Sequence, residues 1–142
     1  KVFRFEDAIS SLSCGISQQM VGIFLKVALG AGYVWVYENF RFATIEMNSW
    51  AAWFGIMILV DLAYFFFHWA SHRVNFIWAT HVVHHQSEEY NLSTALRQSI
   101  FQGLMSAPFY LPLALLGFPP LMLLLTITVN TLYQFWIHTQ LI

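Results

Sequence analysis

Five of the six histidines in this chain of 142 residues lie between residues 68 and 85, at spacings that suit metal binding. His68 and His72 are four residues apart, so on a helix they lie one turn apart on the same face. His81, His84 and His85 repeat this spacing. Imidazole binds iron, zinc, copper and nickel, and five imidazoles exceed the four ligands of one tetrahedral zinc. The pattern predicts a metal site, and two adjacent ions would account for the number of ligands.

Polar residues inside apolar segments are further candidates. Asp61 lies seven residues before His68 and therefore on the same helical face. A carboxylate in a membrane span is costly and usually functional. We predict that it accepts a hydrogen bond from a ligating imidazole; a hydrogen bond elsewhere in the bundle is the open alternative. A polar stripe at four-residue spacing could line a cavity or join helices: Thr126, Asn130, Gln134 and His138.

His138 is the sixth histidine and a further candidate metal ligand, next to an apolar segment that ends near residue 137. A single histidine at a membrane interface often only packs there, so the two clustered motifs carry the prediction. No HExxH, Walker, GxGxxG or GxSxG motif is present. Zinc-protease, nucleotide-binding and serine-hydrolase interpretations therefore have no support.

The composition indicates a membrane protein. Hydrophobic residues make up 58% of the chain and charged residues 9%, against about 25% charged in soluble domains. Disorder is excluded, because it needs low hydrophobicity and many charges. The net charge of −1 gives no electrostatic footprint for nucleic acid, so we expect no nucleic-acid partner. The single cysteine, Cys14, excludes an internal disulfide.

Four apolar segments, each about as long as a bilayer span requires, predict an all-α polytopic membrane helical bundle with about four transmembrane helices in a single domain. They cover approximately residues 19–37, 50–67, 99–118 and 119–137. Between the last two, Gly117-Phe118-Pro119-Pro120 predicts a tight helical hairpin, because glycine ends helices and proline begins them.

The expected topology brings all six histidines to one membrane face if each segment spans once. The same side carries Lys1, Arg4, Arg73 and Arg97, whereas the other side carries Arg41 alone. Because cytoplasmic loops are enriched in Lys and Arg, we predict that the histidines face the cytosol.

The motifs HxxxH at residues 68–72 and HxxHH at 81–85, at the cytosolic end of apolar segments, resemble the fatty acid hydroxylase superfamily. That superfamily includes sterol desaturases and sterol C4-methyl oxidases. Residues 61–72, 81–86, 88–99 and 133–139 further resemble its branch that cleaves glyceryl ether lipids. The resemblance covers most of the chain and is strongest between residues 61 and 99.

The resemblance implies a multi-pass membrane monooxygenase, in the endoplasmic reticulum if the source is eukaryotic. It implies two irons, O2 and tetrahydrobiopterin as cofactor, and a lipid substrate such as an alkylglycerol. Hydroxylation of the ether-linked carbon would give a hemiacetal that breaks down to a fatty aldehyde and a glycerol derivative. His68 and His72 form the first histidine box, and His81, His84 and His85 the second. His138 lies just before the expected position of the third.

A third HxxHH motif does not occur in residues 1–142. We expect it beyond Ile142, so that these residues form part of a hydroxylase domain and do not turn over substrate alone. Two alternatives stay open. One is a lipid oxidase of the sterol desaturase or C4-methyl oxidase type. The other is a non-catalytic membrane protein that binds a metal, or haem between His68 and His138.

Overall fold

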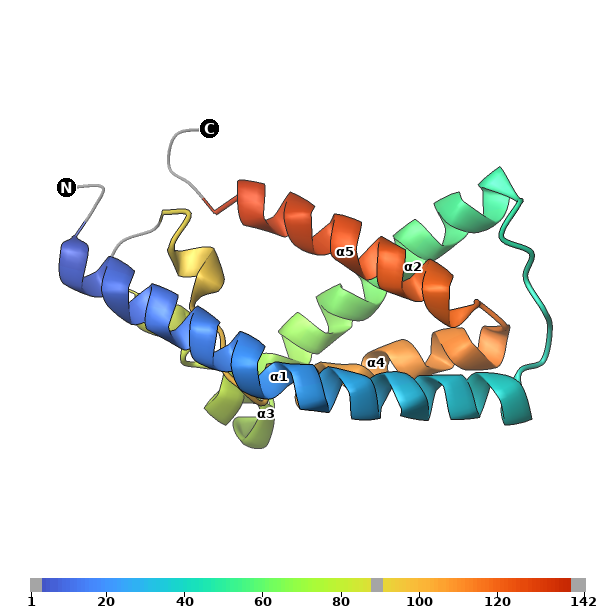
Figure 1. Ribbon diagram of the computed structural model, residues 1–142, viewed down its shortest axis with the longest axis horizontal. Coiled ribbons are helices and arrows are strands. Elements are labelled where there is room, and N and C mark those ends of the chain that lie inside the picture. Colours follow the sequence, from blue (N-terminus) through green and yellow to red (C-terminus); the bar gives the residue numbers. More distant parts are fainter. Residues whose placement is uncertain (1–3, 88–90, 139–142) are drawn as a thin grey trace.

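The computed structural model describes residues 4–87 and 91–138, and these ranges fold into helices without any strand. The four long helices are α1 (Phe5–Phe40), α2 (Trp50–Ser71), α4 (Gln102–Leu116) and α5 (Pro120–Trp136) (Figure 1). Between α2 and α4 lie the short helix α3 (Asn75–His81) and two 3-10 turns, η1 (His84–Gln86) and η2 (Thr94–Leu96). The predicted all-α fold is confirmed.

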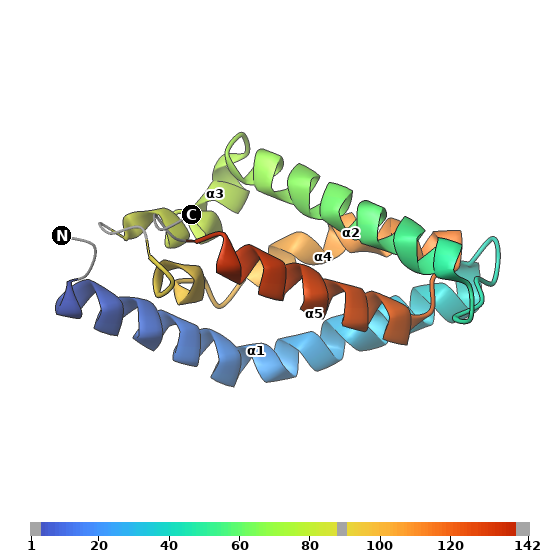
Figure 2. The ribbon, with the colours of Figure 1, turned by 90° about the horizontal axis from the view of Figure 1, so that it is seen from above.

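The long helices run lengthwise between two ends of the molecule (Figure 2). The connections from α1 to α2 and from α4 to α5 lie at one end. The start of α1, the end of α5, and α3, η1 and η2 lie at the other, which we call the histidine end. Short connections therefore reverse the chain twice. The second histidine motif lies in the long polar connection, residues 72–101.

Two helices are long and apolar enough to cross a membrane, α1 with 36 residues and α2 with 22. Helices α4 and α5 have 15 and 17 residues, fewer than the about 20 that a bilayer core requires. Helix α1 begins at Phe5 rather than near residue 19, because no proline interrupts its polar first half.

The apolar core lies toward the end opposite the histidines and draws on all four long helices. The Tyr33 hydroxyl donates to the backbone carbonyl of Phe118 at 2.9 Å, which ties α1 to the α4–α5 turn. The buried members of this core include Tyr33, Ile56, Val60, Leu113, Ala114 and Met122. Packing at one end thus fixes the direction in which each helix approaches the other end.

The predicted hairpin between α4 and α5 is confirmed. Gly117 ends α4 with a φ of 94° and Pro120 begins α5. The turn packs against the α1–α2 connection: the amide of Ile45 donates to the Gly117 carbonyl at 3.1 Å. A Cβ atom at position 117 would lie 2.0 Å from the carbonyl oxygen of Ala43. Only glycine satisfies both the left-handed backbone and this close approach.

Gly117→Ala is expected to destabilise the protein by about 1–3 kcal/mol through the positive φ alone, with a further loss from the Ala43 contact. Thermal unfolding in detergent micelles, followed by circular dichroism, measures this. Gly30→Ala is the matched control, because a Cβ there meets nothing within 4 Å. Equal melting temperatures for the two variants would contradict the analysis.

Candidate metal centre

Four of the predicted ligands converge at the histidine end. One ring nitrogen each from His68, His72, His81 and His85 lies within 4.8 Å of the others. His68 lies in the last turn of α2 and His72 is the residue that caps its C-terminus. The chain then turns back, with the amide of Val74 donating to the Ala70 carbonyl at 2.8 Å. Helix α3 and η1 supply the other two. We call these residues the four-histidine group.

The geometry of this group fits a metal ion held by imidazoles. The Nε2 atoms of His68 and His72 are 3.1 Å apart, as are those of His81 and His85. With metal–nitrogen bonds of about 2.0–2.1 Å, two ligands of one ion at right angles lie about 3 Å apart. His81 is 2% exposed, and its buried Nδ1 atom has no hydrogen-bond partner among the described residues. His72 and His85 are exposed, which leaves the group open on one side.

The remaining two histidines form a second pair, His84 from η1 and His138 after the end of α5. Their Nε2 atoms are 3.3 Å apart. His84 Nδ1 lies 3.2 Å from the Arg97 carbonyl oxygen, and His138 Nδ1 lies 2.6 Å from that of Gln134. Because a carbonyl only accepts, both rings donate through Nδ1. In the neutral rings, two lone pairs on Nε2 then face each other, an arrangement that a cation between them stabilises.

The pair and the four-histidine group are adjacent. The ring centroid of His84 lies 5.7 Å from that of His81 and 5.5 Å from that of His85. All six predicted ligand candidates therefore come together at one end of the fold, arranged as four and two. The fold therefore offers two adjacent groups of imidazole nitrogens that could hold metal ions.

The surroundings of His81, His84 and His85 favour the uncharged imidazole. Burial and, to a smaller extent, the neighbouring histidines together lower the pKa of His81 to about 3. Burial likewise lowers the pKa of His84 to about 4, against the hydrogen bond to Arg97, which raises it. The pKa of His85 is lowered by burial and by His72. Metal ions bind neutral imidazole, so these residues are in the binding form at neutral pH.

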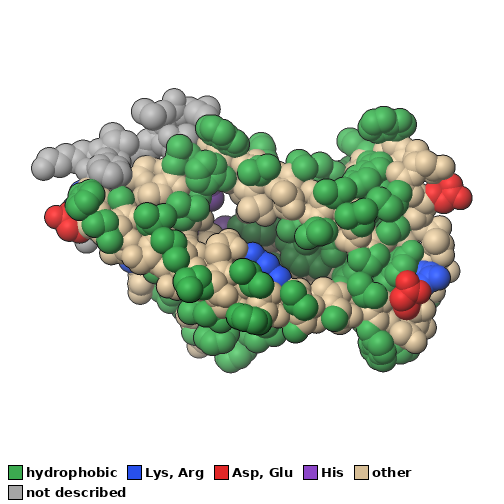
Figure 3. Space-filling model, in the orientation of Figure 1, with side chains coloured by type: hydrophobic (Ala, Val, Ile, Leu, Met, Phe, Trp, Pro, Cys, Tyr) green, Lys and Arg blue, Asp and Glu red, His purple; other side chains and the backbone are tan. Residues whose placement is uncertain are grey.

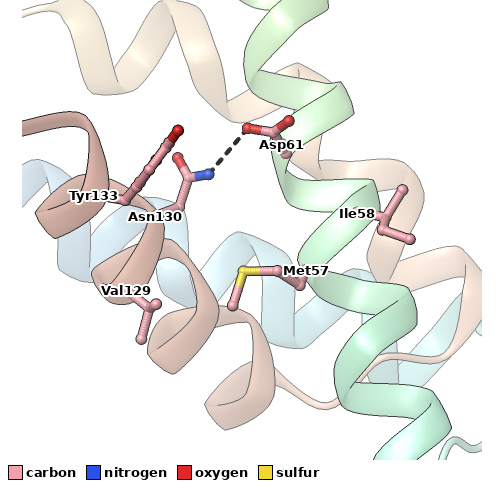
Figure 4. A pocket seen from close by; sticks show the side chains of 6 residues that line it. All are labelled: Met57, Ile58, Asp61, Val129, Asn130 and Tyr133. Atoms are coloured by element: carbon pink, nitrogen blue, oxygen red, sulfur yellow. Dashed lines mark hydrogen bonds between the residues drawn. The ribbon is translucent and has the colours of Figure 1, made fainter. Parts of the chain in front are cut away.

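Asp61 is connected to the histidines indirectly, through a series of hydrogen bonds along α5. Its Oδ1 accepts from the Asn130 amide at 3.3 Å (Figure 4). The Asn130 carbonyl oxygen in turn accepts from the Gln134 amide, and the Gln134 backbone carbonyl accepts from His138. The polar stripe on α5 therefore joins α2 to the second histidine pair. Thr126, its first member, donates to the Met122 carbonyl within its own helix.

The stripe also borders a pocket of about 390 Å³ between α2 and α5 (Figure 4). Asp61 lies about 10 Å along α2 from His68, at 1.5 Å per residue. Most of the lining is apolar: Met57, Ile58, Val129 and Tyr133 line the pocket with Asp61 and Asn130. On the face seen in Figure 3, a hollow floored by hydrophobic side chains opens near its centre, with histidine side chains at its rim.

Sequence reasoning did not identify the Arg97 carbonyl as the partner of His84, because a backbone acceptor leaves no signal in residue types. It also did not separate His84 from His81 and His85, since it treated the second motif as one helical face. In the structure α3 ends at His81 and η1 is a 3-10 turn. His85 thus faces His81, whereas His84 faces His138.

Comparison with known proteins adds independent information. The profile of the fatty acid hydroxylase family matches residues 53–142, which include all six histidines. Alkylglycerol monooxygenase of Homo sapiens is 42% identical over 139 residues, covering 98% of this chain and 31% of that protein. The Danio rerio protein of that name matches with the same identity and coverage.

The Caenorhabditis elegans protein of that name is 33% identical over 147 residues, which cover 99% of this chain and 28% of that protein. The chain therefore spans about a third of the length of the curated relatives it matches. No solved structure matches it.

His72→Ala is expected to weaken metal binding by the four-histidine group at least roughly tenfold, the loss known for perturbed metal sites. His138→Ala is expected to weaken only the binding by the second pair. Titration with Co(II), followed by its visible absorption, separates the two events. Thr128→Ala on α5, a hydroxyl bonded only within its helix, is the control. Loss of both events in each variant would contradict two separate positions.

Acid is expected to destabilise the metal-free protein. Between the ordinary histidine pKa of about 6.5 and the lowered pKa values near 3 and 4, the unfolded chain binds protons that the folded chain does not. The free energy of unfolding therefore falls as the pH falls through this window. Thermal unfolding at several pH values measures the slope, and His81→Gln/His84→Gln should flatten it. An unchanged slope in this variant would assign the acid sensitivity to other groups.

Proposed function

The chain belongs to the fatty acid hydroxylase family, and from this premise we propose that it forms the metal-binding part of a membrane-bound di-iron monooxygenase acting on glyceryl ether lipids. The observation that carries the proposal is the pair of adjacent imidazole groups at one end of an apolar helical bundle. We take residues 1–142 as one partial hydroxylase domain, because the relatives are about three times as long.

His68, His72, His81 and His85 would hold one iron, and His84 and His138 would contribute to the second. The second ion would need ligands beyond these two, and the relatives have the additional length to supply them. Iron bound here supplies the cleavage of a C–H bond by dioxygen, which acid–base side chains cannot perform. The protein keeps His81 and His84 neutral by burial, and Trp78 covers the rings of His72 and His85 with centroid distances of 5.3 and 5.6 Å.

The alkylglycerol substrate is taken from the printed name of the relatives, with tetrahydrobiopterin as the electron donor from the same resemblance. Two features of the chain support a lipid. A hollow with a hydrophobic floor has histidine side chains at its rim (Figure 3), and the pocket between α2 and α5 is largely apolar. An alkyl chain bound in this hollow would have its polar end near the metal ions. The ether bond must lie there, because the ether-linked carbon is the one that is oxidised.

The geometry favours this function over haem binding. Two axial ligands on opposite sides of one haem iron lie about 4 Å apart with the porphyrin between them, at about 2 Å per bond. His84 and His138 are closer, at 3.3 Å. The haem alternative needs His68 and His138 as opposed ligands, whereas His68 Nε2 lies against His72 and His138 Nε2 lies against His84.

In the membrane, we propose that all four long helices cross and that the histidine end faces the cytosol, in the endoplasmic reticulum if the source is eukaryotic. The lengths of α1 and α2 support two crossings. Arg4 and Arg73 lie at the histidine end and Arg41 at the opposite end. Arg97 is paired with Asp7, and Lys1 lies outside the described residues, so the orientation rests on two arginines against one.

The test uses the protein expressed from its complete reading frame, loaded with Fe(II) in lipid nanodiscs. With tetrahydrobiopterin and an alkylglycerol, we expect fatty aldehyde that requires O2, measured by mass spectrometry. His84→Ala should lower the rate by more than roughly a hundredfold, the scale lost when a metal site is perturbed. The ester analogue of the same chain length is the control substrate. Oxidation of a sterol instead would favour the sterol-oxidase alternative, and no oxidation with the metal sites filled would overturn the proposal.

A further inference from the structure

Helix α1 carries no histidine, yet it contacts the metal centre through an ion pair. Asp7 Oδ1 accepts from Arg97 Nη1 at 2.9 Å, and the two side chains are only 11% and 14% exposed. The chain has only six basic and seven acidic residues, and removing two of these charges from water is costly unless further hydrogen bonds compensate. A contribution to stability alone therefore does not explain why this ion pair is buried.

Asp7 holds both sides of the segment that follows the second histidine motif. Its Oδ2 accepts from the Ser87 hydroxyl at 2.5 Å. Ser87 comes directly after η1 and Arg97 directly after η2. One carboxylate thus connects the two positions that bracket residues 88–96, and it does so from the first turn of α1.

The same arginine reaches His84 through its backbone. The Arg97 carbonyl accepts from His84 Nδ1 at 3.2 Å, which places the ring proton on Nδ1 and the lone pair on Nε2, toward His138. The Gln98 amide nitrogen lies 3.4 Å from the same Nδ1, and Gln98 Oε1 is buried with no partner. The Gln98 amide nitrogen also donates to the Ala95 carbonyl at 3.4 Å, so the shorter 3.2 Å contact with the Arg97 carbonyl is the one that assigns the tautomer.

A second contact shows independently that α1 supports this segment. A Cβ atom at Gly15 would lie 2.8 Å from the Leu96 carbonyl oxygen and 3.2 Å from Leu96 Cβ. Helix α1 therefore approaches η2 at backbone distance just before Arg97. The Arg97 carbonyl is held from two sides, by the ion pair at its side chain and by the packing of Gly15 on its neighbour.

We propose that Asp7 is a positioning residue for the second metal-binding pair: through Arg97 it fixes the tautomer of His84 and presents Nε2 to the metal ion. The inference rests on the metal centre of the proposed function. It assigns α1 a role in tuning one metal position and not the other, since the hydrogen bonds of the four-histidine group do not involve Arg97.

The test compares Asp7→Asn with the wild type in the complete protein. In the metal-free state, nitrogen-15 NMR of labelled histidine reports the tautomer of His84, assigned with His84→Gln. We expect Asp7→Asn to populate the Nε2–H form of His84. We also expect it to weaken binding of the second Co(II) equivalent by roughly 10–100-fold, the range for loss of an outer hydrogen-bond partner, with the first equivalent unchanged. Asp7→Glu should restore both properties.

Glu38→Gln is the matched control, because the Glu38–Arg41 pair has a similar length of 3.0 Å but lies exposed at the opposite end of α1. It should leave the tautomer and both Co(II) equivalents unchanged. If Asp7→Asn does not accumulate as folded protein, Gly15→Ala carries the test, since it displaces Leu96 without altering a charge and should give the same signature.

A wild-type tautomer and a wild-type second equivalent in these variants would overturn the inference. So would an equal loss of both equivalents together with a lower melting temperature, which would assign Asp7 to folding alone. Fewer than two Co(II) bound by the wild type would instead count against the proposed metal centre, so the two failures are distinguishable.

Discussion

Imidazole rings that face one another through unprotonated nitrogens repel each other, and the histidine end of this fold contains such a contact. His84 and His138 each donate through Nδ1 to a backbone carbonyl, so their Nε2 lone pairs face each other at 3.3 Å. Protonation does not relieve the repulsion, because burial opposes it. A bound cation does relieve it, so the histidine end depends on force applied from elsewhere to hold the rings together. The apolar core at the opposite end and the contacts of α1 supply that force.

The part of the molecule that stabilises the fold therefore differs from the part that presents the histidine nitrogens. Tyr33, Val60 and Met122 pack in an apolar core that would hold the helices together without any histidine. Around the histidines, in contrast, hydrogen bonds and one buried ion pair accompany the aromatic contacts. Such contacts set direction more than they add stability. This division suits a centre in which small displacements of a nitrogen atom change the affinity for a metal ion.

The sequence was informative wherever residue type alone decides the structure. Glycine and proline at 117–120 predicted the hairpin, and the order of the apolar segments predicted that the histidines converge at one end. The division into four and two was not predictable, because α3 ends at His81 and a 3-10 turn sends His84 away from His85. The start of α1 at Phe5 was also missed, since hydropathy does not reveal a polar extension of a helix. The Arg97 carbonyl is a backbone group and leaves no trace in composition.

The order of these elements along the chain has a consequence for biogenesis. The four-histidine group is complete between residues 68 and 85, so a ribosome that has released η1 has already delivered all four of these side chains. His84 acquires its partner only after α4 and α5 have been synthesised and His138 has returned to the same end. If each group binds one ion, as proposed above, metal loading can follow translation in two stages, and the first ion can bind before α4 and α5 are complete.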